Sequence, residues 1–63
     1  MKKIENGVYS IIDITIHRIA EYNEHDTLVT RWELQKAGEW IEMDSFDTLR
    51  EARGYVMQKW HTL

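Results

Sequence analysis

The feature that most constrains this chain is an alternation of apolar and polar side chains from Val8 to Ala20. Two shorter alternating stretches follow, and then one helical pattern that begins at Thr48. A period of two predicts strands, and one helix can cover only one face of a small sheet. The sequence therefore predicts an α+β domain of order β-β-β-α: a three-stranded antiparallel meander with a C-terminal helix packed on one face. The other face is left open.

Length and composition limit what such a domain can be. With 63 residues the chain predicts a single domain over 1–63, near the size at which one core leaves a small margin of stability. It has no cysteine, which excludes disulfides and thiolate metal sites and is typical of a cytoplasmic protein. Glu5, Asn6 and Asp13 interrupt any N-terminal apolar run, and no stretch approaches the roughly 20 apolar residues that a membrane span needs. We expect no targeting segment and no membrane contact.

The alternation assigns the faces of the first two strands. In the first strand the core side is predicted to hold Val8, Ile12, Ile14 and Ile16. The open side is predicted to hold Tyr9, Ile11, Asp13, Thr15, His17 and Ile19. The second strand is predicted from about Thr27 to Lys36, with Leu28, Trp32 and Leu34 on its core side. The polar segment 21–26 is expected to connect the two strands.

A turn at Ala37-Gly38 with an even number of connecting residues fixes the register of the third strand. This register predicts the pairs Gln35 with Trp40, Leu34 with Ile41, Trp32 with Met43 and Arg31 with Asp44. The pair of Arg31 with Asp44 is favourable, whereas the same register sets Glu33 against Glu42.

The helix has a specific start signal. Thr48 and Glu51 have the spacing of a capping box, in which the threonine oxygen accepts a hydrogen bond from a free backbone N–H. Apolar residues then recur at helical spacing and form a stripe predicted to lie on the sheet: Leu49, Ala52, Val56, Trp60 and Leu63.

Two surfaces are candidates for binding another protein. The open sheet face is predicted to present Tyr9, Ile11, Ile19, Val29, Arg31, Trp40, Glu42 and Asp44. Trp and Tyr are frequent binding hot spots. The outer helix face is predicted to present Arg50, Gly54, Met57 and His61, where the glycine either permits close approach by another backbone or is simply tolerated. A homodimer is one form that such contacts could take.

The charge distribution favours a protein partner. Eleven Asp and Glu outnumber eight Lys and Arg, and residues 37–47 carry four acids with no Lys or Arg. An acidic, aromatic sheet face predicts docking on a basic patch of another protein, as an inhibitor of a nucleic-acid site would do. The alternative is that the acids only keep a small domain in solution.

Other chemistries fit the sequence poorly. His17, His25 and His61 lack the spacing of a metal or catalytic site, and no glycine-rich phosphate loop is present. We therefore expect no enzyme activity, cofactor or metal. Nucleic-acid binding through the helix residues Arg50, Arg53 and Lys59 is the alternative function. The general character of the chain is similar to that of many small proteins carried by bacteria and their phages, which favours a regulator or inhibitor of a host protein.

Overall fold

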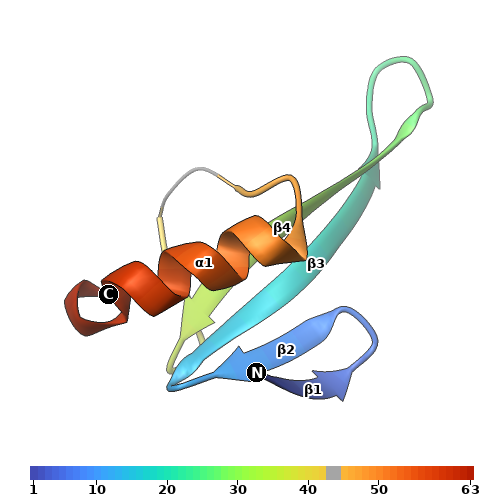
Figure 1. Ribbon diagram of the computed structural model, residues 1–63. Coiled ribbons are helices and arrows are strands. Elements are labelled where there is room, and N and C mark those ends of the chain that lie inside the picture. The colour runs from blue at the N-terminus through green and yellow to red at the C-terminus, as the bar shows by residue number, and fades with distance from the viewer. Residues whose placement is uncertain (43–44) are drawn as a thin grey trace.

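The computed structural model describes residues 1–42 and 45–63. These residues form an antiparallel sheet of five strands in sequence order, β1-β2-β3-β4-β5 (Figure 1). The strands are β1 (Lys2–Glu5), β2 (Val8–Ile11), β3 (Ile14–Tyr22), β4 (Leu28–Lys36) and β5 (Glu39–Trp40). The α+β class and the antiparallel order of the sheet are as predicted, but the predicted count of three strands was too low.

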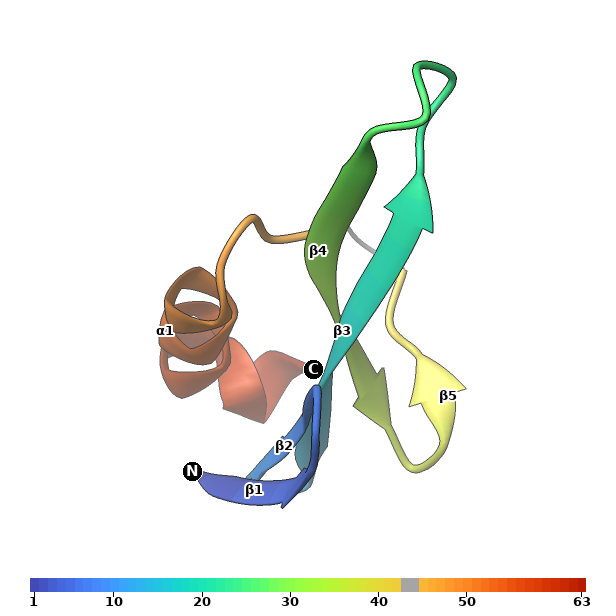
Figure 2. The same ribbon diagram turned by 90° about the vertical axis from the view of Figure 1, so that its right-hand side faces the viewer.

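Helix α1 (Leu49–Lys59) follows the sheet and continues into a short 3-10 turn, η1 (Trp60–Thr62). It lies on one face of the sheet, near the middle of β3 and β4 (Figures 1 and 2). The Thr48 hydroxyl accepts a hydrogen bond from the Glu51 backbone N–H at 3.1 Å. The predicted N-cap is confirmed, and so is the placement of the helix on the sheet.

The predicted first strand is two strands joined by a tight turn. Ile12 and Asp13 connect β2 to β3, and Ile12 is exposed with φ of 57°. Because Ile11 is the partner of Ile14 across this turn, odd residues before it share a face with even residues after it. Ile11 is therefore buried in the core, and the predicted core position of Ile12 was wrong.

The N-terminal strand β1 was not predicted. Asn6 and Gly7 connect it to β2, and Gly7 adopts φ of 81°. The Gly7 carbonyl accepts a hydrogen bond from the Arg18 N–H at 2.7 Å, which anchors this turn to β3.

The core lies between α1 and the helix-side face of the sheet. Its buried members are Ile11, Ile14, Ile16, Leu34, Ala52 and Val56. Partly buried residues pack around them: Trp32, Ile41, Phe46, Leu49, Tyr55 and Leu63. The predicted stripe is confirmed except at Trp60, which is exposed. Val8, predicted in the core, is opposite His17 on the open face.

The third predicted strand is short, and its register is partly confirmed. Gln35 is the partner of Trp40, and the Ile41 N–H donates to the Leu34 carbonyl at 3.0 Å. Trp32 instead forms a bridge with Phe46. The predicted partners Met43 and Asp44 lie outside the described residues.

The molecule measures 38 × 23 × 21 Å. The distal half of the β3–β4 hairpin projects beyond the rest of it (Figure 1). A helix of 11 residues is about 17 Å long, whereas strands of nine residues span about 30 Å, so α1 cannot cover the whole hairpin. Residues 20–30 are all exposed. Leu28, predicted in the core, therefore lies outside it. We call residues 20–30 the arm.

Candidate functional site

The open face of the sheet, opposite α1, is the candidate site. Residues that are partners across strands share a face, so the register defines its rows. One row joins Ser10, Thr15, Gln35 and Trp40, a second joins Val8, His17 and Glu33, and the next joins Ile19 and Arg31. No described helix packs over these rows, and none of these residues is buried. On the opposite face Ile14, Ile16 and Leu34 are 0% exposed.

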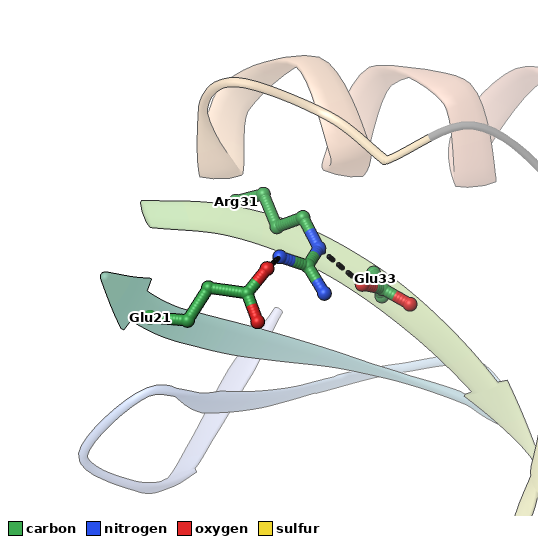
Figure 3. A network of polar contacts seen from close by, with 3 residues as sticks. All are labelled: Glu21, Arg31 and Glu33. Carbon is green, nitrogen blue, oxygen red and sulfur yellow. Dashed lines mark hydrogen bonds and ion pairs between the residues drawn. The ribbon is translucent and has the colours of Figure 1, made fainter. Parts of the chain in front are cut away.

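An ion cluster occupies the centre of this face. The Arg31 guanidinium donates from Nε to Glu33 Oε2 at 2.5 Å and from Nη1 to Glu21 (Figure 3). The hydrogen bonds to Glu33 and Glu21 raise the pKa of Arg31. Two carboxylates therefore hold one guanidinium in a fixed position. The cluster has a formal charge of −1, and its arginine is already engaged.

Apolar and aromatic side chains flank the cluster on both sides. Trp40 is 51% exposed, and the His17 ring packs against it edge-on with a centroid separation of 5.1 Å. The Thr15 hydroxyl lies 2.8 Å from His17 Nε2, which holds the imidazole in place. Towards the arm, Ile19 is half-buried and Val29 is 41% exposed. The face is a partly apolar surface around an acidic centre.

The structure brings together part of the predicted set. Ile19, Val29, Arg31 and Trp40 lie on the open face as predicted. Tyr9 and Ile11 lie on the helix side instead. The turn at Ile12 places the odd-numbered residues of β2 on the same face as the even-numbered residues of β3. The Tyr9 ring is 6.0 Å from that of Trp32 there. Glu42 is exposed after β5, and Asp44 lies outside the described residues.

The predicted binding set did not include Glu21 and Glu33, the two acids of the Arg31 cluster, nor His17, although His17 was predicted on the open side of the sheet. A strict period of two, continued from Ile19 to Glu21 and from Arg31 to Glu33, places both acids on the open face. Glu21 was instead assigned to the connecting loop, whereas β3 extends to Tyr22.

The second predicted surface is the outer side of the helix. Arg50, Gly54, Met57 and His61 are all exposed. No described atom outside the local chain lies within 4 Å of the position that a Gly54 Cβ would occupy. The described fold therefore gives no steric reason for glycine at this position.

Sites for small ligands are absent from the part of the chain that the structure describes. Residues 1–42 and 45–63 form no pocket and no cluster of side chains suited to a metal ion. Within the same ranges no helix has the length and apolar content needed to cross a membrane.

Comparison of the chain with protein-family models, with curated proteins and with solved structures finds no match.

Proposed function

We propose that this protein is a non-enzymatic interaction module that docks on another protein through the open face of its sheet. The observation that supports this most is the arrangement of Trp40, Val29 and Ile19 around the Arg31 cluster on a face that no described helix covers. Exposed aromatic and aliphatic side chains around a fixed polar group resemble the hot-spot region of an interface. The partner is a protein with a basic, partly apolar patch, and a bacterial or phage regulator or inhibitor in the cytoplasm fits this role.

The Arg31 cluster favours a protein partner over nucleic acid. Phosphate recognition needs cations that can reach the backbone, but Arg31 already donates to Glu21 and Glu33. A phosphate would have to displace a carboxylate and would be repelled by the other. A partner lysine or arginine instead meets two carboxylates that Arg31 has already oriented.

Nucleic-acid binding through the helix is the second candidate. Arg50 and Arg53 are exposed, and neither forms an ion pair with another described residue. Binding of this kind depends on counterion release, so its affinity must fall steeply with salt and with substitution of Arg50 and Arg53.

Replacing Trp40 with Ala and Val29 with Ser in one variant should remove most of the partner binding. Both side chains are exposed, so we expect a loss of affinity of at least about tenfold with little change in stability. The measurement is quantitative capture of partner protein from a bacterial lysate by tagged wild type and variant.

The matched control is Tyr22→Ser, which removes an exposed aromatic ring on the helix-side face of the arm. It should retain wild-type capture. Equal recovery by wild type and by the Trp40/Val29 variant would exclude the open face as the docking surface.

A further inference from the structure

The arm presents an acidic and apolar tip. Its turn carries Glu24 and Asp26, and residues 20–30 contain no Lys or Arg. On its helix-side face Tyr22 and Leu28 are directly opposite each other, 70% and 57% exposed. Nothing in the described chain covers this pair.

Local hydrogen bonds close the tip. The Asn23 side-chain oxygen accepts hydrogen bonds from the backbone N–H groups of His25 at 2.9 Å and Thr27 at 3.1 Å. The Asn23 N–H donates to the Thr27 carbonyl at 3.0 Å. A loop closed in this way loses little conformational entropy when it binds.

A complementary surface runs along the helix. Arg50, Arg53, Met57 and Trp60 recur at spacings of three and four residues, so they form a stripe on one flank of α1 and the start of η1. All four are exposed, and the stripe is distinct from the buried side that holds Ala52 and Val56. Two of its members are basic and two are apolar, which matches the acids and apolar residues of the arm.

The two surfaces do not meet within one chain. In both views the tip of the β3–β4 hairpin lies away from α1 (Figures 1 and 2). Glu24 has only the neighbouring His25 as an ion-pair partner among the described residues, at 3.6 Å, and Arg50 and Arg53 have none there. Contact between the surfaces therefore requires two molecules.

We propose that the chain self-associates, with the Tyr22, Leu28 and acidic tip of one copy bound to the Arg50, Arg53, Met57 and Trp60 stripe of a second copy. Around a two-fold axis each copy supplies one arm and one helix, so every favourable contact occurs twice. This surface differs from the open face, so the proposal does not depend on the docking function.

Sedimentation velocity over a range of protein concentrations tests the proposal through charge reversal. We expect the wild type to form a dimer, and Arg53→Glu and Glu24→Arg each to weaken dimerisation at least tenfold, which corresponds to about 1.4 kcal/mol. The double variant carrying both changes should recover wild-type association, because the opposite charges face each other again. Circular dichroism of each variant checks that the fold is retained.

Lys2→Glu is the matched control, since it makes the same change of net charge as Arg53→Glu on the exposed strand β1. It should dimerise like the wild type, and so should the open-face variant at Trp40 and Val29. Any of three results would overturn the proposal: a wild type that stays monomeric, a double variant that dimerises as weakly as the single variants, or a Lys2→Glu variant whose dimerisation is weakened as much as that of Arg53→Glu. A monomeric wild type that binds a labelled oligonucleotide through Arg50 and Arg53 would assign the stripe to nucleic acid.

Discussion

Leu34→Ala is expected to lower the free energy of unfolding by about 2–5 kcal/mol. Leu34 is 0% exposed and packs between the sheet and α1 with Ile16 and Val56. Removing a fully buried leucine side chain costs about 2–5 kcal/mol, because transfer free energy is lost and a cavity is left. A domain of 63 residues has a total stability near the low end of the usual 5–15 kcal/mol. One core substitution therefore removes a large share of it.

Urea unfolding followed by tryptophan fluorescence measures this effect. Leu28→Ala is the matched control, since it makes the same chemical change at a position that is 57% exposed on the arm. We expect the control to change the free energy of unfolding by no more than about 0.5 kcal/mol at concentrations too low for association. Similar losses for the two variants would contradict the placement of the core beneath α1.

Gly7→Ala is expected to be the most damaging glycine substitution. Gly7 has φ of 81°, and left-handed backbone costs a residue with a Cβ about 1–2 kcal/mol. An added Cβ would also lie 3.3 Å from both Cβ and Nε of Arg18, on the strand that donates to the Gly7 carbonyl. Backbone strain and crowding therefore add at the turn that holds β1 and β2 to β3.

Gly38→Ala separates the backbone strain from the crowding. Gly38 also has φ of 81°, but no described atom outside the local chain lies within 4 Å of its added Cβ. We expect Gly38→Ala to show only the backbone cost in thermal unfolding, and Gly7→Ala to show a larger loss of stability. Equal losses would mean that Arg18 moves aside without cost.

Local chemistry made some elements predictable from sequence. Thr48 and Glu51 define the helix start, because a hydroxyl that accepts a backbone N–H is a short-range signal. The turn at Ala37-Gly38 was predictable because glycine takes positive φ readily, and the pair of Gln35 with Trp40 follows from it.

The turn at Ile12-Asp13 could not be predicted in this way. Isoleucine is a strong strand former and rarely takes positive φ, so the alternation in the sequence runs through the turn without a break. Two strands were merged for this reason. Tyr9 and Ile11 were consequently assigned to the open face, while Ile19, on the far side of the turn, was placed correctly.

The extent of the core could not be predicted from the alternation, because it depends on how far α1 reaches along the strands. Leu28 alternates like a core residue, yet α1 is too short to reach it. The Arg31 cluster likewise needed the true end of β3, because Glu21 joins the face only when the strand continues to Tyr22. Periodicity assigns faces, whereas coverage depends on the relative lengths of the helix and the strands.

The most direct test of the docking function is a tagged pull-down from bacterial lysate, with and without nuclease, in which retained protein and nucleic acid are both quantified. We expect stoichiometric recovery of one protein that survives nuclease and is lost with the Trp40→Ala/Val29→Ser variant but not with Tyr22→Ser. Recovery that disappears with nuclease and with substitution of Arg50 and Arg53 would contradict the docking function, because the basic flank of α1 would then be the working surface.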